Sequence, residues 1–148
     1  MISYSPEAIE ILVIEDNKVD IAVTKEALKI SKVLNNLSIV EDGEEAIKYL
    51  RKEGNYKNMP RPDLILLDLN LPKLDGREVL SIIKKDDELK AIPVVVLTVS
   101  EDEADIADAY NLHANCYITK PVDFEKFEEI VRKIESFWFS IVKLPRAD

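Results

Sequence analysis

The sequence contains one cysteine, three glycines and one histidine among its 148 residues. With Cys116 alone no intrachain disulfide can form, and the cysteine content gives no sign of export. No apolar run approaches the roughly 20 residues that a membrane-spanning helix needs. The first residues also lack the basic and apolar regions of a signal peptide. We therefore expect a soluble cytoplasmic protein with no membrane partner.

Positive charge is also in short supply, because 20 lysines and arginines face 29 acidic residues and the net charge is −9. Such a balance argues against wholesale binding to nucleic acid or to an anionic membrane, which reward clustered basic side chains. The chain is 47% hydrophobic and 33% charged, as a globular domain is. Its length suits one domain, and no linker leads to a second one. We expect residues 1–148 to form a single domain with a C-terminal helical extension and without an output domain.

Short apolar runs alternate with segments of helical spacing along the chain. This alternation predicts an α/β fold, a doubly wound five-stranded parallel sheet with helices on both faces. The predicted strands are Ile9–Ile14, Leu37–Val40, Leu64–Leu67, Pro93–Leu97 and Ala114–Ile118. The predicted helices are Val19–Leu34, Glu44–Leu50, Arg77–Lys85, Glu101–Asn111 and a last helix capped by Asp123.

The stretch Pro62–Gly76 is the most informative part of the sequence. Four apolar residues, Leu64–Leu67, run directly into Asp68, and Pro72 and Gly76 then mark a turn. In open α/β sheets ligands bind at the carboxyl ends of the strands. The side chains expected at that edge are Glu15 and Asp16 after the first strand, Asp68 and Asn70 after the third, Thr98 after the fourth, and Lys120 before Pro121 after the fifth.

These residue types fit one kind of chemistry. Three carboxylates close together need a cation to balance them, and all-oxygen ligation suits Mg²⁺. The hydroxyl of Thr98 and the ammonium of Lys120 are what a bound phosphoryl group needs. We therefore expect Asp68 to attack phosphorus and form an aspartyl phosphate.

The pattern resembles the receiver domain of bacterial two-component response regulators, over roughly Glu10 to Ile134. The resemblance implies a flavodoxin-like fold with strand order 2-1-3-4-5. It also implies that a histidine kinase donates the phosphoryl group and that the aspartyl phosphate is lost by slow self-catalysed hydrolysis. The roles implied by position are Asp68 as phosphoacceptor, Asp16 as direct Mg²⁺ ligand, Glu15 as ligand through water, Asn70 as ligand through its backbone carbonyl, Lys120 as phosphoryl partner beside a cis bond to Pro121, and Thr98 with Tyr117 as the switch pair.

Finer features are similar to the small single-domain regulators that are paired with phytochrome-type histidine kinases. They are the long loop Glu53–Arg61, the run Leu-Asp-Leu-Asn-Leu-Pro, the stretch from Leu112 to Pro121 and the aromatic tail. With no output domain expected, the signal would pass to a downstream protein by contact. The predicted fourth helix, fifth strand and last helix are the natural moving face.

The aromatic tail predicts a homodimer, because large apolar patches usually mark interfaces. Its candidate residues are Phe137, Trp138, Phe139 and Ile141. We interpret His113, in a helix-to-strand turn, as structural or exposed, and Cys116, inside a predicted buried strand, as an inert small hydrophobe.

Three other functions are compatible with this fold. A phosphatase of the aspartyl-phosphate type commonly has a second aspartate two residues after the nucleophile, where this chain has Asn70, so we expect no enzyme activity beyond self-dephosphorylation. A flavodoxin-like cofactor binder favours a loop rich in small residues after the first strand, where this chain has Glu15-Asp16-Asn17. A constitutive interaction module remains if Asp68 takes no phosphate.

Overall fold

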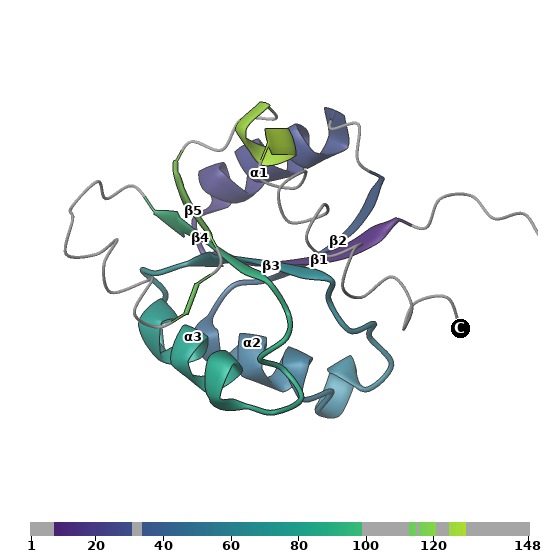
Figure 1. Ribbon diagram of the computed structural model, residues 1–148, viewed down its shortest axis with the longest axis vertical. Coiled ribbons are helices and arrows are strands. Elements are labelled where there is room, and N and C mark those ends of the chain that lie inside the picture. The colour runs from purple at the N-terminus through teal and green to yellow at the C-terminus, as the bar shows by residue number, and fades with distance from the viewer. Residues whose placement is uncertain (1–7, 31–33, 99–112, 115, 121–124, 130–148) are drawn as a thin grey trace, which may run out of the picture.

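The computed structural model describes residues 8–30, 34–98, 113–114, 116–120 and 125–129. Five parallel strands form one sheet in the order β2-β1-β3-β4-β5, as predicted (Figure 1). The strands are β1 (Ile9–Ile14), β2 (Asn35–Val40), β3 (Leu64–Asp68), β4 (Val94–Thr98) and β5 (Cys116–Thr119). Among the described residues, no helix is long and apolar enough to cross a bilayer.

Helices cover both faces of this sheet (Figure 1). The helix α1 (Lys18–Ile30) and the helical residues 125–129 lie on one face, and α2 (Gly43–Leu50) and α3 (Gly76–Lys85) lie on the other. A short 3-10 turn, η1 (Gly54–Tyr56), follows α2. The two faces hold separate apolar cores, one built around Phe127 and Leu28 and the other around Leu80 and Ile83.

The central strand β3 explains the unbroken apolar run in the sequence. It pairs with β1 on one side, where Ile11 lies opposite Leu64, and with β4 on the other, where Asp68 lies opposite Leu97. All five of its residues are buried, because neighbouring strands and both helical layers enclose it. The carboxylate of Asp68 is therefore held by the most enclosed strand of the sheet.

The described part of the first helix, Lys18–Ile30, begins one residue before the predicted Val19, and residues 31–33 lie outside the described ranges. Asn17 caps it, since the Asn17 Oδ1 accepts hydrogen bonds from the backbone N–H groups of Val19 (2.9 Å) and Asp20 (3.0 Å). Only one stripe faces the sheet, namely Ile21, Thr24, Ala27 and Leu28. Val19, Val23, Ile30 and Leu34, which we had included in the apolar pattern, are exposed.

Several other boundaries differ from the prediction by one or two residues. The second strand begins at Asn35 rather than Leu37, because it pairs with β1 from Ile9 onward. The fourth and fifth strands are displaced toward the carboxyl end, to Val94–Thr98 and Cys116–Thr119. The predicted helix Glu101–Asn111 lies outside the described residues.

The edge position of β5 corrects the interpretation of Cys116. The strand pairs with β4 alone among the described strands, and Cys116 is half-buried against the core on the α1 face. A strand at the edge of a sheet has one side without a neighbour, so Cys116 is less enclosed than the sequence suggested. His113 precedes this strand in an exposed turn, with φ at 69°.

Two glycines hold the loop that follows Asp68. A Cβ on Gly76 would lie 2.3 Å from the Asp68 carbonyl oxygen, and the Gly76 N–H donates to the Leu69 carbonyl at 3.0 Å. A Cβ on Gly43 would lie 2.1 Å from the Leu74 carbonyl oxygen. Both positions exclude a side chain, and so the loop packs closely against the end of β3 and the start of α2.

Candidate functional site

Asp68 lies at the carboxyl end of β3 and is only 4% exposed. One carboxylate oxygen, Oδ1, accepts a hydrogen bond from the Asn70 N–H at 2.9 Å. The other, Oδ2, accepts one from the Lys120 Nζ at 3.0 Å. The side chain is thus fixed in position by its own loop and by the end of β5.

The residues after β1 supply two further carboxylates. Glu15 is buried, and its Oε2 accepts hydrogen bonds from the backbone N–H groups of Asp16 (3.1 Å) and Asn17 (3.2 Å). Asp16 is exposed. One carboxylate oxygen from each of Glu15, Asp16 and Asp68 can be chosen so that the three lie within 4.8 Å of one another.

This group of oxygens fits a divalent cation. Carboxylate and carbonyl oxygens are the ligands that Mg²⁺ and related hard cations take, and one exposed member leaves an entry path from solvent. Glu15 Oε1 is buried, and its partner among the described residues is the ammonium of Lys120, with which it forms an ion pair. A bound cation would balance the negative charge of these oxygens, which Lys120 balances only in part.

The carboxylates and the lysine alter each other's protonation. Burial, together with the nearby Asp68, raises the pKa of Glu15 to about 7, and Lys120 opposes that rise. Burial alone would lower the pKa of Lys120, but the carboxylates around it, that of Asp20 first, raise it above its ordinary value. Lys120 therefore stays positively charged at neutral pH while Glu15 is poised near its titration.

Asp20 is a site residue that the sequence analysis did not find. Its Oδ2 lies 2.8 Å from the Lys120 Nζ, so the ammonium contacts the carboxylates of Asp20, Asp68 and Glu15 together. Asp20 lies in the first turn of α1. The sequence did contain a signal for Asp20. It follows the acidic pair Glu15-Asp16 by one helical turn, and this spacing places it at the same edge of the sheet.

The remaining predicted residues are described only in part. Thr98 ends β4 with its backbone opposite Thr119, and its side chain lies outside the described part of the structure. Tyr117 is half-buried in β5 and packs against the core on the α2 and α3 face. Pro121 and the tail residues 137–141 fall outside the described ranges, so the cis bond and the dimer patch stay predictions.

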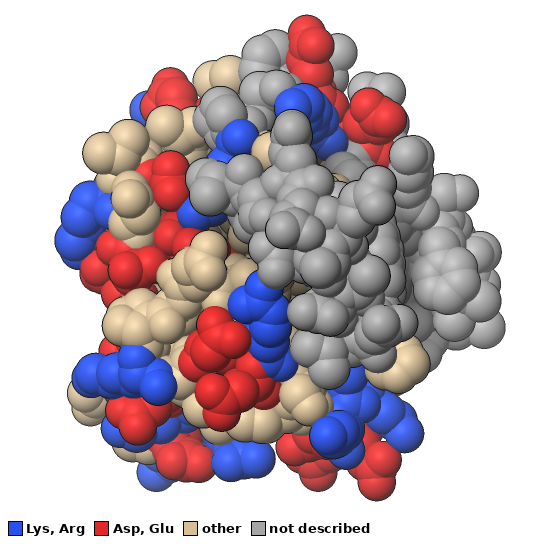
Figure 2. Space-filling view, turned by 90° about the vertical axis from the view of Figure 1, so that its left-hand side faces the viewer, with Lys and Arg blue, Asp and Glu red and all other residues tan. Residues whose placement is uncertain are grey.

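Figure 2 shows the edge of the molecule where the strands end. Acidic side chains gather over the left half of this view, with basic side chains between and below them. The predicted strand-end residues Glu15, Asp16, Asp68 and Lys120 meet at this edge. The arrangement provides a fixed carboxylate, a fixed ammonium and a cation-binding group of oxygens, which together suit the transfer of a phosphoryl group to Asp68.

Comparison with known proteins agrees with this chemistry. A family model described as "Response regulator receiver domain" matches residues 11–132. The protein "Response regulator Rcp1" from Synechocystis sp. is 51% identical over 137 residues, which cover 93% of this chain and 93% of Rcp1. The similarity therefore extends over nearly all of both chains.

Two solved structures extend the comparison. The phosphorylated cyanobacterial phytochrome response regulator RcpA is 55% identical, with a TM-score of 0.77 over 90% of this chain and 96% of RcpA. The Mn²⁺-bound form of Rcp1 is 51% identical, with a TM-score of 0.74 over 88% of this chain and 94% of that one. One of these relatives is thus known with a phosphoryl group and the other with a divalent metal.

Proposed function

The chain belongs to the response regulator receiver family and is a response regulator of two-component signalling, and from that premise we propose that Asp68 is its phosphoacceptor. The observation that carries the proposal is the contact of the buried Asp68 carboxylate with Lys120, beside the carboxylates of Glu15 and Asp16. Glu15 shares the lysine and the carboxylate group, but of the three carboxylates only that of Asp68 lies at the end of the central, fully buried strand β3.

The proposed reaction moves a phosphoryl group from a kinase histidine to this aspartate. The Asp68 Oδ2 or Oδ1 forms a bond to phosphorus while the bond from phosphorus to the histidine nitrogen breaks, and the electron pair leaves with the imidazole. Lys120, held against Asp68 at 3.0 Å, counters the negative charge of the phosphoryl oxygens. Thr98, which ends the neighbouring strand, is proposed to donate its hydroxyl to the same oxygens and to form the switch pair with Tyr117.

Mg²⁺ is the proposed resident cation. Receiver domains bind a divalent metal, and a relative is known in an Mn²⁺-bound form. Glu15, Asp16 and Asp68 would hold the ion together with the backbone carbonyl of Asn70, in line with the carboxylate group described above. When bound, Mg²⁺ supplies positive charge to the transferring phosphoryl group.

A sensor histidine kinase is the phosphoryl donor implied by family membership. We propose that it is of the phytochrome type, because RcpA, at 55% identity, is a cyanobacterial phytochrome response regulator. The chain matches 93% of the length of Rcp1, and this supports a regulator that works through its receiver domain and passes its signal by contact with a downstream protein. Slow loss of the phosphoryl group and homodimerisation through the aromatic tail are parts of the same proposal.

The proposal is tested by intact-mass spectrometry after incubation with acetyl phosphate and Mg²⁺. We expect the wild-type protein to gain the mass of one phosphoryl group. The Asp68→Asn variant and a chelator-treated sample should gain none, because the nucleophile or the cation is missing. The control variant Asp87→Asn changes an exposed aspartate that pairs with Lys90 on the surface, and it should be phosphorylated like the wild type.

The kinase is tested separately from the chemistry of the site. A phytochrome-type kinase and an unrelated histidine kinase, each phosphorylated beforehand, should transfer label to the chain at different rates, with the phytochrome-type kinase faster. Equal rates would contradict the phytochrome pairing and leave Asp68 as the acceptor. A failure of both kinases and of acetyl phosphate would contradict phosphorylation and favour a constitutive interaction module.

A further inference from the structure

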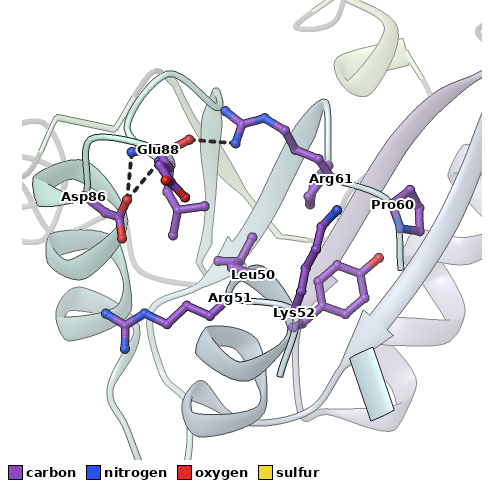
Figure 3. Close-up of a pocket in the computed structure, with 10 residues that line it drawn as sticks. Leu50, Arg51, Lys52, Pro60, Arg61, Asp86 and Glu88 are labelled. Carbon is purple, nitrogen blue, oxygen red and sulfur yellow. Dashed lines mark hydrogen bonds between the residues drawn. The ribbon is translucent and has the colours of Figure 1, made fainter. Parts of the chain in front are cut away.

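A pocket of about 410 Å³ lies at the edge of the sheet opposite the phosphoacceptor. Its walls are the end of α2, the segment just before β3, and the turn after α3 (Figure 3). Asp68 ends β3, whereas Pro60 and Pro62 in the pocket wall precede that strand. The volume falls within the range of about 300 to 1,000 Å³ that is usual for small-molecule sites. The pocket therefore takes no part in the site described above.

Three positively charged side chains border this pocket. Arg51 and Lys52 come from the end of α2 and Arg61 comes from the segment before β3. In Figure 3, Arg51 and Arg61 extend along opposite sides of the pocket, and Lys52 rises between them. Among the described residues none of the three forms an ion pair with a carboxylate, although 29 acidic residues outnumber the basic ones in this chain.

The pocket is also lined by two acidic residues, Asp86 and Glu88, and neither forms an ion pair with the three cations. The Asp86 Oδ1 accepts hydrogen bonds from the backbone N–H groups of Glu88 (2.8 Å) and Leu89 (3.2 Å), so it serves the turn after α3. Glu88 contributes its backbone carbonyl, which accepts a hydrogen bond from the Arg61 Nη1 at 2.6 Å and fixes that guanidinium at the rim.

The backbone at Lys52 supports a role for its side chain. Lys52 follows the helix with φ at 56°, in the left-handed region, and its N–H donates to the Tyr49 carbonyl at 3.1 Å. Glycine is the usual residue at this position after a helix, because a side chain there is strained. A lysine at such a position lowers the stability of the fold. Its side chain places a positive charge at the rim of this pocket.

The floor of the pocket is apolar. Tyr49, Leu50, Pro62 and Leu89 line it, and all four are buried. A ligand would therefore meet an apolar surface below and, at the rim, three basic and two acidic side chains. The forked guanidinium groups of arginine match the oxygens of phosphate, and an aromatic ring fits an apolar floor.

We propose that this pocket binds an organic phosphate of nucleotide size, with its phosphates against Arg51, Lys52 and Arg61 and its aromatic portion on the apolar floor. The three basic side chains outnumber the two acidic ones in the lining, and the pocket therefore favours a negatively charged group. This site is independent of the phosphorylation of Asp68.

The test is a titration of the ¹⁵N-labelled protein with adenosine diphosphate, followed by NMR in about 150 mM salt without divalent cations. We expect saturable shifts of the backbone amides of residues 49–52, 61 and 86–89. Pyrophosphate, which lacks the aromatic portion, should bind more weakly. The variant Arg51→Gln/Lys52→Gln should weaken binding by about tenfold or more, because charged hydrogen bonds are lost.

Two further variants separate ligand binding from stability and from net charge. Lys52→Gly should raise the melting temperature, since glycine suits φ at 56°, and yet weaken binding. The control Lys25→Gln/Lys29→Gln removes the same two charges from exposed positions on α1, on the other face of the sheet, and should bind like the wild type.

Several results would overturn the proposal. They are the absence of saturation at about 10 mM ligand, which means a dissociation constant above that concentration, shifts centred away from the pocket, or an equal loss of binding in the Lys25→Gln/Lys29→Gln control. If pyrophosphate bound as tightly as adenosine diphosphate, the pocket would be a site for inorganic anions and the proposed contact with the aromatic portion would be wrong. Tighter binding of an acidic peptide than of the nucleotide would assign the surface to a protein partner instead.

Discussion

At the scale of single residues, negative charge around Asp68 exceeds what one lysine balances. Three carboxylates, those of Glu15, Asp20 and Asp68, contact the ammonium of Lys120, and the carboxylate of Asp16 lies near those of Glu15 and Asp68. Like charges at such separations repel, and part of the folding free energy is lost to that repulsion. Without a bound cation, the repulsion between these carboxylates therefore lowers the stability of the folded protein.

We predict that Asp68→Asn stabilises the metal-free protein. Removing one of the crowded charges should raise the free energy of unfolding by about 1 kcal/mol, because Lys120 keeps its contacts with Glu15 and Asp20. Added Mg²⁺ should then stabilise the wild type more than the variant, since binding to the folded state shifts unfolding. Urea denaturation with a chelator and with saturating Mg²⁺ measures both effects.

The exposed aspartate Asp87 serves as the control for this prediction. It forms a surface ion pair with Lys90 at 3.0 Å, and Asp87→Asn should respond to Mg²⁺ as the wild type does. If Asp68→Asn proved less stable than the wild type in chelator, the idea that repulsion dominates at this edge would be wrong.

A second residue-scale prediction concerns Lys84, whose ammonium is partly buried at the end of α3. Its Nζ donates to the carbonyl oxygens of Ile92 (2.8 Å) and Lys90 (3.1 Å), and burial lowers its pKa from 10.5 to about 8. Between pH 8 and 10.5 the unfolded chain holds a proton at this lysine that the folded protein has released. The free energy of unfolding should therefore rise with pH across that window.

The contribution of Lys84 is isolated by comparison with Lys84→Met. The stability of the wild type relative to this variant should increase from pH 8 to pH 10.5, as measured by urea denaturation at several pH values. Lys85→Met, an exposed neighbour at the end of the same helix, should show no such trend. Parallel curves for the wild type and Lys84→Met would contradict the prediction.

At the scale of elements, the loop between β3 and α3 depends on α2. Gly43, the first residue of α2, lies against Leu74, and its N–H points to the Pro72 carbonyl at 3.5 Å. Lys73, in the same loop, pairs with Asp42, which caps α2. The loop that carries Asn70 is thus positioned by a helix from another part of the chain.

We predict that Gly43→Ala destabilises the protein by about 2 kcal/mol or more, because its Cβ would overlap the Leu74 backbone and the loop would have to shift. Metal affinity should fall as well, since the same loop supplies the Asn70 carbonyl. Gly54→Ala is the matched control: at φ 57° with no atom within 4 Å, it should cost about 1 kcal/mol in backbone strain and leave metal affinity unchanged. Equal effects of the two variants on metal affinity would argue against this coupling.

At the scale of the whole molecule, the two proposed sites lie at opposite edges of the sheet. The carboxylates lie where the strands end, and the three unpaired cations border the pocket at the other edge. Although the net charge of the molecule is −9, basic side chains outnumber acidic ones in the lining of the pocket. A partner would therefore meet different chemistry at each end.

The proposed homodimer belongs to this scale. We predict that Phe137→Ser/Phe139→Ser raises the dimer dissociation constant by about tenfold or more, because large aromatic residues dominate interfaces. Sedimentation analysis over a range of concentrations measures it. Val19→Ser/Val23→Ser removes exposed apolar side chains from α1 and should leave the dimer intact. A wild type that stays monomeric, with or without phosphate, would contradict the dimer.

Local patterns in the sequence determined much of this protein. The apolar runs and helical spacings predicted all five strands, their parallel arrangement and the helices on both faces. The edge where Glu15, Asp68 and Lys120 meet was also predictable, because polar residues that follow buried parallel strands arrive at one place. These features depend on neighbours within a few positions along the chain.

Only the tertiary structure decided the rest. Asp20 and Lys120 are 100 residues apart in the sequence, and their contact arises when α1 and β5 fold against the same edge. The half-burial of Cys116 follows from the edge position of its strand, and the group of cations at the pocket forms because the end of α2 and the segment before β3 lie side by side there. Each depends on packing between distant segments, which residue spacing along the chain does not record.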